Sequence, residues 1–104
     1  MANADPLTAL GDPTRRAILE RLAGGPMAVG AIAHGLPVSR PAVSQHLRVL
    51  KQAGLVRDRA VANRRLYSVD PRGLDAVRAY VDQFWNHALE AYRRAAEQAE
   101  EDST

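Results

Sequence analysis

Apolar residues recur at helical spacing along most of the chain, and glycine and proline residues divide this pattern into separate elements. Asp5-Pro6 and Asp12-Pro13 each place a capping carboxylate before a proline, which is a common start of a helix. We therefore predict a short helix that ends before Gly11 and a second helix that ends before Gly24. The predicted apolar face of the second helix consists of Ala17, Ile18 and Leu22.

The next segment contains short elements separated by small residues. Residues 27–29 predict a very short strand, and residues 31–34 predict a weak helix interrupted by glycine. A tight connection at residues 36–38 leads into the next helix, which begins near Arg40. Two helices joined in this way form a helix-turn-helix.

The helix that begins near Arg40 has clear ends and one apolar stripe. Ser39 is a suitable N-cap, and Gly54 is a suitable terminator. Val43, Leu47 and Leu50 recur at helical spacing, so we expect these three side chains to be buried.

The opposite stripe of this helix contains Pro41, Ser44, Gln45 and Arg48, none of which is a large aliphatic residue. An ordinary amphipathic surface helix usually exposes several long charged side chains, glutamate among them. Here no acidic residue occurs from residue 39 to residue 57. Because an acid-free face approaches phosphates without repulsion, the pattern favours a helix that reads the major groove of DNA.

A hairpin and a long helix complete the pattern. We predict strands at residues 55–60 and 65–69 with a loop at residues 61–64, in which Asn63 tolerates a left-handed conformation. The final helix is predicted over about residues 73–100. Its apolar stripe is wider than one coiled-coil seam and includes Leu74, Val77, Tyr80, Val81, Phe84, Trp85, Ala88, Leu89, Tyr92, Ala95, Ala96 and Ala99.

The length of this stripe predicts self-association. One alternative is that the helix folds back completely onto its own domain. A domain of this size has too little surface to cover the whole stripe, so we expect part of it to meet a second copy of the chain. The acidic block Glu97, Glu100, Glu101 and Asp102 is expected to be a solvated, fraying tail.

Composition agrees with a single small domain over residues 1–104 that contacts a polyanion. Residues 39–72 carry eight basic and two acidic residues, whereas the rest of the chain carries six basic and ten acidic residues. Cysteine is absent, so the chain has no disulfide and no thiolate metal ligand. The sequence contains neither a membrane-spanning apolar run nor a signal peptide, which predicts a cytosolic location.

Residues 10–22, 39–56 and 64–70 resemble the ArsR/SmtB family of bacterial winged-helix repressors, and the resemblance extends over about residues 7–92. It implies a mainly α-helical fold with a small β-hairpin, a winged helix-turn-helix. It also implies a homodimer through the first and last helices, and repression by occlusion of an operator. The expected interface residues are Leu7, Leu10, Val77, Val81, Phe84, Trp85, Ala88 and Tyr92.

The chain departs from the metal-sensing members of this family. It lacks their Cys-x-Cys pair, and its final helix has one histidine, His87, near Asp82 and Glu90. Ala62-Asn63 also replaces the usual glycine at the tip of the hairpin, or wing. The chain thus resembles members without a metal site, and we expect no metal, no cofactor and an inducer of unknown chemistry.

The predicted partner is double-stranded DNA with an inverted repeat. Arg40 and His46 are expected at phosphates or in packing rather than at bases, and the wing is expected at the backbone or minor groove. Any one of the wing arginines could instead pair with Asp58 or Asp70. No nucleophile elbow or phosphate-binding glycine loop is present, so we expect no enzyme activity. The alternatives are a metal-responsive repressor and a winged helix that binds a partner protein. The complete set of predicted DNA-binding residues is Ser39, Arg40, Pro41, Ser44, Gln45, His46, Arg48, Arg57, Arg59, Asn63, Arg64 and Arg65.

Overall fold

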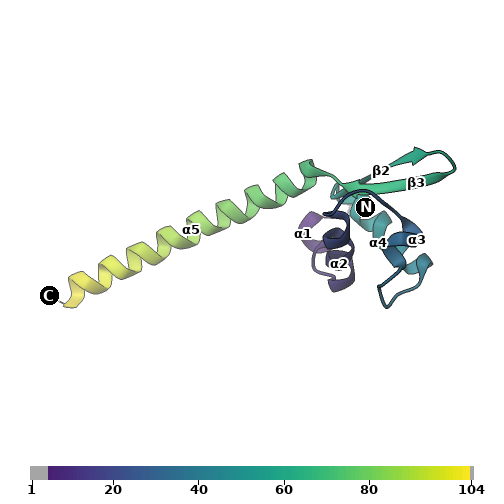
Figure 1. Cartoon of the computed structure of the whole chain (residues 1–104). Coiled ribbons are helices and arrows are strands. Elements are labelled where there is room, and N and C mark those ends of the chain that lie inside the picture. The colour runs from purple at the N-terminus through teal and green to yellow at the C-terminus, as the bar shows by residue number, and fades with distance from the viewer. Residues whose placement is uncertain (1–4, 104) are drawn as a thin grey trace.

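A small body and a long helix that projects from it make up the computed structural model, which describes residues 5–103 (Figure 1). Helices α2, α3 and α4 pack together in the body, and a three-stranded sheet lies beside them. This arrangement is the predicted winged helix-turn-helix. The helices of the body are α1 (Pro6–Ala9), α2 (Pro13–Leu22), α3 (Val29–Ala33) and α4 (Arg40–Gln52).

Helices α1, α2 and α4 begin at the predicted capping residues. The Asp12 carboxylate accepts hydrogen bonds from the backbone N–H groups of Thr14 and Arg15, at 2.8 and 3.1 Å. Ser39 Oγ accepts a hydrogen bond from the N–H of Ala42 at 3.2 Å. These bonds satisfy N–H groups that have no partner inside the helix, and they lock the direction in which each helix starts.

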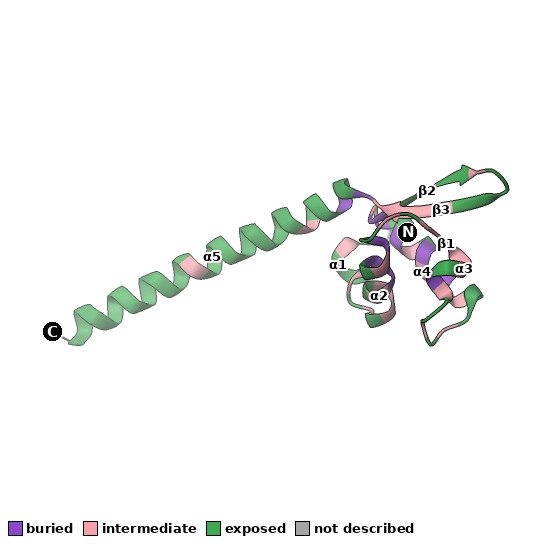
Figure 2. Ribbon diagram, viewed as in Figure 1, coloured by how far each residue is buried: buried purple, intermediate pink, exposed green. Residues whose placement is uncertain are grey.

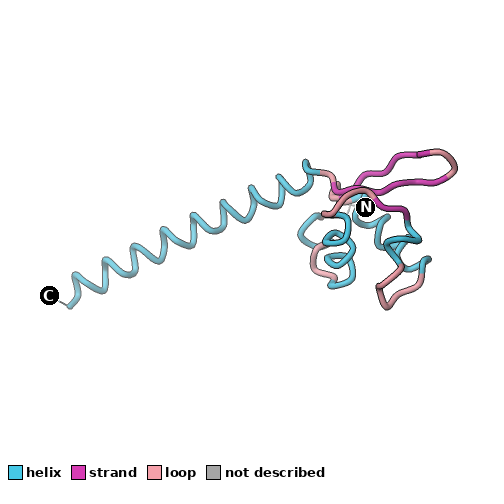
Figure 3. The backbone as a smooth tube through the Cα atoms, in the orientation of Figure 1, coloured by secondary structure: helices cyan, strands magenta, loops and turns pink. Residues whose placement is uncertain are grey.

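The sheet contains β1 (Met27–Ala28), β3 (Arg64–Val69) and β2 (Val56–Val61), in that spatial order and all antiparallel (Figure 3). Val61 pairs with Arg64, so a turn of two residues joins β2 to β3 instead of the predicted four-residue loop. The left-handed residue of this turn is Ala62, with φ of 56°, and not Asn63 as predicted. Two-residue hairpin turns require positive φ at their first central residue, and Ala62 holds that position.

The hydrophobic core lies where α2, α3 and α4 meet the sheet (Figure 2). The predicted stripe of α4 is confirmed as buried, as are Ile18 and Leu22 of α2. Ala17 is only half-buried, and Leu19 is buried in addition. The weak helix, predicted over residues 31–34, begins earlier, at Val29. The largest fully buried side chains are Ile18, Ile32, Val43, Leu47, Leu50 and Leu55.

Helix α5 (Pro71–Ser103) runs away from the body instead of folding back onto it (Figure 1). Its side chains are exposed along almost the whole length, apart from the buried Gly73 and the half-buried Val77 and Leu89 (Figure 2). The acidic tail is exposed as predicted, and its residues are helical up to Ser103.

A buried junction connects α5 to the body. The backbone N–H of Asp70 donates to the carbonyl of Leu55 at 2.9 Å, and the Asp70 carboxylate accepts a hydrogen bond from the N–H of Arg72 at 3.1 Å. The Arg72 side chain also donates to this carboxylate and holds the pKa of Asp70 below its ordinary value. The start of α5 is therefore hydrogen-bonded to Leu55, the residue that precedes β2.

Candidate nucleic-acid interface

The exposed stripe of α4 has the composition expected of a reading helix. Pro41, Ser44, Gln45 and Arg48 are all exposed, on the side of the helix opposite its buried stripe. Within the described residues, no acid lies on this stripe, and neither Gln45 nor Arg48 makes a side-chain hydrogen bond or ion pair. Their amide and guanidinium groups are therefore available to an incoming ligand.

Two of the predicted DNA-binding residues at the start of α4 also have structural partners. Ser39 Oγ accepts the capping bond from Ala42, which leaves its hydroxyl hydrogen free to donate. The Arg40 guanidinium lies over Gly30 of α3, where an added Cβ would be 3.3 Å from Nη2. Arg40 is exposed and lies at the edge of the stripe.

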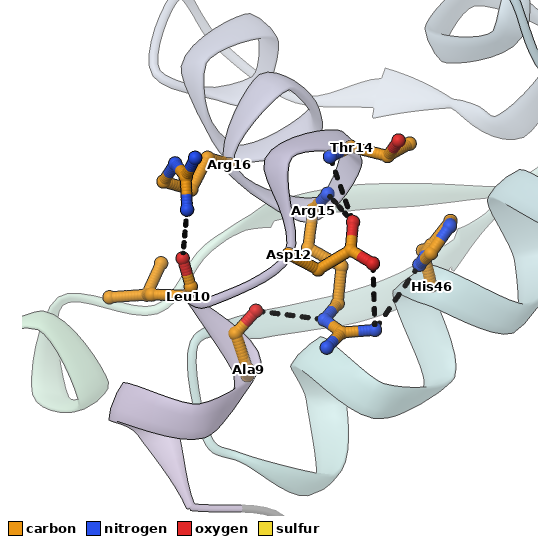
Figure 4. Close-up of polar contacts among 7 residues, drawn as sticks. All are labelled: Ala9, Leu10, Asp12, Thr14, Arg15, Arg16 and His46. Atoms are coloured by element: carbon orange, nitrogen blue, oxygen red, sulfur yellow. Dashed lines mark hydrogen bonds and ion pairs between the residues drawn. The ribbon is translucent and has the colours of Figure 1, made fainter.

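His46 is half-buried and faces α2 rather than open solvent (Figure 4). Its Nδ1 lies 3.4 Å from Nη1 of Arg15. The same arginine donates from Nε to the carbonyl of Ala9 at 2.8 Å, and its Nη1 lies 3.9 Å from the Asp12 carboxylate. Arg15 therefore joins α1, α2 and α4, a role that the sequence analysis did not assign to it.

The hairpin separates its arginines between two faces. Because Arg57 pairs with Ser68 and Val61 pairs with Arg64, strand alternation places Arg57, Arg59 and Arg64 on one face. Their exposed guanidinium groups form no hydrogen bond or ion pair with any other described residue. Asn63 is exposed at the tip between the strands. The predicted common face of Arg57 and Arg59 is confirmed.

Arg65 lies on the other face of the hairpin, where it is paired. Its Nη1 donates to Oδ2 of Asp58 at 2.9 Å, and Nζ of Lys51 lies 2.8 Å from Oδ1 of the same carboxylate. Lys51 and then Arg65 hold the pKa of Asp58 below its ordinary value, against the opposing effect of burial. We name these three residues the Asp58 cluster. Sequence alternation alone did not reveal it, because Lys51 belongs to a different element.

The predicted interface residues of α5 are exposed in the single chain. Val81, Phe84, Trp85 and Tyr92 have exposed fractions of 50%, 66%, 63% and 72%. Ala88 is exposed among them. The remaining residues lie nearer the body: Leu7 is 36% exposed, whereas Leu10 and Val77 pack partly against the core of their own chain.

Two hollows flank these elements. One, of about 230 Å³, lies between α4 and the sheet and is lined by Ser44, Leu47, Arg48, Lys51 and Tyr67. The other, of about 520 Å³, is mainly apolar and lies where α2, β3 and the first turn of α5 meet.

Residues 5–103 contain no group of three or more His, Cys, Asp or Glu side chains that could hold a metal ion. None of the helices in the same range is long and apolar enough to cross a membrane.

The chain is similar in sequence to proteins that are named as transcriptional regulators. A family model described as a helix-turn-helix domain matches residues 10–59. The HTH-type transcriptional regulator Rv2034 of Mycobacterium tuberculosis is 57% identical over 95 residues, which cover 91% of this chain and 89% of the relative. The transcriptional repressor SdpR of Bacillus subtilis is 44% identical over 62 residues, which cover 60% of this chain and 69% of the relative.

A comparison of the fold with solved structures gives the same result as the comparison of sequences. The chain is similar to the solution structure of the homodimeric winged helix-turn-helix DNA-binding domain Mb0332 of Mycobacterium bovis, described as a possible ArsR-family regulator. The TM-score is 0.64 with 31% identity, over 78% of this chain and 75% of that chain. The chain belongs to the ArsR/SmtB family. As an ArsR/SmtB protein it is a DNA-binding transcriptional regulator. The predicted winged helix-turn-helix fold and the predicted role in DNA-binding regulation are confirmed, whereas the homodimer and the inverted repeat stay predictions.

Proposed function

We propose that this ArsR/SmtB regulator is a homodimeric repressor that binds an inverted repeat and thereby occludes a promoter. Each α4 would read the major groove of one half-site, and each wing would contact the backbone or the adjacent minor groove. Two half-sites about one helical turn apart would match the two-fold symmetry of the dimer. We also propose that the protein acts in the cytoplasm, catalyses no reaction and forms one domain with a dimerisation helix.

The observation that carries this proposal is the acid-free stripe of α4. Ser44, Gln45 and Arg48 combine short hydrogen-bonding groups with one cation on an exposed helix face. Glutamine is suited to adenine, and arginine is suited to guanine or to a phosphate. A helix that bound a partner protein would instead be expected to expose an apolar anchor at the centre of its face.

The wing supports the proposal through its unpaired cations. Arg57, Arg59 and Arg64 form no ion pair with any of residues 5–103, although Arg57 lies near enough to Asp70 to interact with its charge, so phosphates could neutralise them without breaking an existing ion pair. A narrow two-stranded ribbon with arginines near its tip also fits the minor groove, where the negative potential is high.

Helix α5 supports the homodimer. It carries large exposed apolar side chains at Val81, Phe84, Trp85 and Tyr92, and the body of its own chain leaves them uncovered. Soluble proteins rarely expose a continuous apolar stripe of this kind unless it is an interface. A relative named as a repressor and a neighbour described as a homodimer are consistent with the proposed assembly and activity.

The test is to select duplexes with the wild-type protein from a randomised pool and to measure binding to the selected and a random duplex by anisotropy. We expect an enriched inverted repeat, protected in a footprint over both half-sites. If the dimer contacts about 6–10 phosphates, raising the salt concentration from 50 to 200 mM should lower its affinity for DNA about 10³–10⁵-fold. Recovery of no preferred sequence, or binding that does not respond to salt, would contradict the proposal.

Two variants separate base reading from backbone binding. Gln45→Ala should lower discrimination between the selected and the random duplex, with a loss of about 1–3 kcal/mol on the selected one. Arg64→Ala should weaken binding to both duplexes by a similar factor, because phosphates carry no sequence information. If Gln45→Ala leaves the discrimination ratio unchanged, the assignment of α4 as the reading helix is wrong.

A further inference from the structure

The Asp58 cluster occupies the angle between α4 and the wing. Lys51 lies in the last turn of α4, Asp58 lies on β2, and Arg65 lies on β3. The Asp58 side chain is only 6% exposed, whereas Lys51 and Arg65 are each 57% exposed. One carboxylate therefore joins the reading helix to both strands of the wing, and the two cations face outwards.

In the proposed complex, a phosphate chain must pass across this angle. A helix in the major groove and a ribbon in the neighbouring minor groove have one strand of the duplex between them, because each strand separates adjacent grooves. Lys51 and Arg65 are therefore within the region that phosphates approach. An acid at this position opposes DNA binding unless its charge is compensated locally.

The ion pairs of Asp58 make a small contribution to stability. Ion pairs whose cations are largely exposed contribute little to folding free energy. The pairing nevertheless has a geometric effect, since each carboxylate oxygen holds a different cation, Lys51 on Oδ1 and Arg65 on Oδ2. The side chains of Lys51 and Arg65 are therefore held in one position and do not rotate freely towards a nearby phosphate.

We propose that Asp58 is a specificity-determining residue, which fixes the wing against α4 and withholds Lys51 and Arg65 from indiscriminate phosphate contacts. This inference rests on the proposed function, because it concerns the geometry of the same DNA complex. A duplex with the correct groove shape meets the two cations where Asp58 holds them. A random duplex gains little from them, because they cannot move to meet its phosphates.

The experiment compares Asp58→Asn with Asp75→Asn. Both variants remove one negative charge, but Asp75 is exposed on α5, and its side chain makes no hydrogen bond or ion pair with any residue from 5 to 103. Full-length wild-type and variant proteins are titrated with the selected duplex and with a random duplex of the same length, over a range of salt concentrations. Circular dichroism and thermal unfolding show whether each variant is folded.

We expect Asp58→Asn to raise the affinity for random DNA by about 3–10-fold and to steepen its salt dependence by about 0.9 for each phosphate that a released cation contacts. Binding to the selected duplex should not increase, so the ratio of the two affinities should fall. Asp75→Asn should keep the wild-type ratio. Lys51→Gln combined with Arg65→Gln removes the two cations, and Asp58→Asn should then have no further effect on the ratio.

Equal losses on both duplexes would overturn the inference, because they indicate a purely structural role. Equal gains would also overturn it, because they indicate a change of charge without a change of specificity. If Asp58→Asn does not fold, the single variant Arg65→Gln is measured instead. A lower ratio of the affinity for the selected duplex to that for the random duplex supports the inference, and an unchanged ratio contradicts it. The selection with the wild-type protein is carried out before any variant is compared. If the wild-type protein selects no sequence, this result contradicts the proposed function and not the role of Asp58.

Discussion

A Cβ atom on Gly73, in the first turn of α5, would overlap the backbone carbonyl of Gly54, in the turn that ends α4. Gly54 itself has φ of 77°, a left-handed conformation that glycine adopts without strain. Two glycines in close approach therefore let α5 start directly beside the end of α4. Because backbone opposes backbone here, no side-chain rotation can make room for a larger residue.

Gly73→Ala should consequently destabilise the body. We expect a loss of about 1–3 kcal/mol in the free energy of unfolding, because the added methyl group forces the backbone to shift. Urea denaturation at a fixed protein concentration measures it. Gly24→Ala is the control, since its Cβ would make only an ordinary contact with the Arg21 carbonyl at 3.6 Å. Equal stability of the two variants would show that the junction is not tightly packed.

The stability should fall in acid through three carboxylates. Hydrogen bonds from the Arg15 backbone, the Lys51 side chain and the Arg72 side chain lower the pKa values of Asp12, Asp58 and Asp70, respectively, below 3.8. A lowered folded-state pKa gives stability that is fully present above the unfolded value and is lost as the pH falls through the folded value. We therefore expect the free energy of unfolding to decrease below pH 3.8.

Urea denaturation across this acidic range tests the assignment. Asp58→Asn should flatten the dependence of stability on pH, because it removes one of the three groups responsible. Asp75→Asn, which breaks no hydrogen bond or ion pair, should leave the slope as in the wild type. A slope that is the same in all three proteins would exclude Asp58 as a contributor.

Dimerisation and operator binding should be lost together when the apolar stripe of α5 is charged. Ala88→Glu places a carboxylate in the proposed interface, at a cost of several kcal/mol. Ala79→Glu is a matched control, because nine helical positions place Ala79 on the opposite face of α5. Analytical ultracentrifugation and a mobility-shift assay on the same samples give both measurements. A monomeric Ala88→Glu protein that binds the selected duplex normally would contradict the dimer model.

Zn²⁺, Ni²⁺, Co²⁺ and arsenite should leave DNA affinity unchanged at micromolar concentrations. The chain has no cysteine and only three histidines, and the described residues contain no cluster of potential ligands. Anisotropy titration with each ion measures the effect. Release of DNA by one ion, reversed by a chelator and absent in His87→Ala, would favour a metal-responsive repressor.

Much of the fold could be predicted from capping residues and periodicity. Ser39, Asp12 and Gly54 act through local backbone chemistry, so their effect on helix ends is visible in the sequence. The Ala62 turn was missed because strand pairing, rather than residue preference, fixes its length. Gly30 was expected to interrupt α3, but it lies within the helix, where the Arg40 side chain packs against it.

In the candidate site, too, local features could be predicted from the sequence, whereas contacts between elements could not. The exposed stripe of α4 depends only on helical spacing, and its predicted exposure is confirmed. The contact of Arg15 with His46 joins residues 31 positions apart, which no local pattern indicates. The pairing of Arg65 with Asp58 is one of the alternatives that the sequence leaves open, and the register of the hairpin decides it. Strand alternation places the adjacent Arg64 and Arg65 on opposite faces of the hairpin, but only the register shows which of these faces carries Asp58.

The glycine junction gives α5 the properties of a lever. A helix of 33 residues spans about 50 Å, so a rotation of about 10° at its base moves its far end by about 9 Å. In the proposed dimer, the separation of the two α4 helices would depend on this angle, and operator half-sites about 34 Å apart would constrain it closely. The spacing between the two α4 helices would thus depend on how Gly73 packs against Gly54.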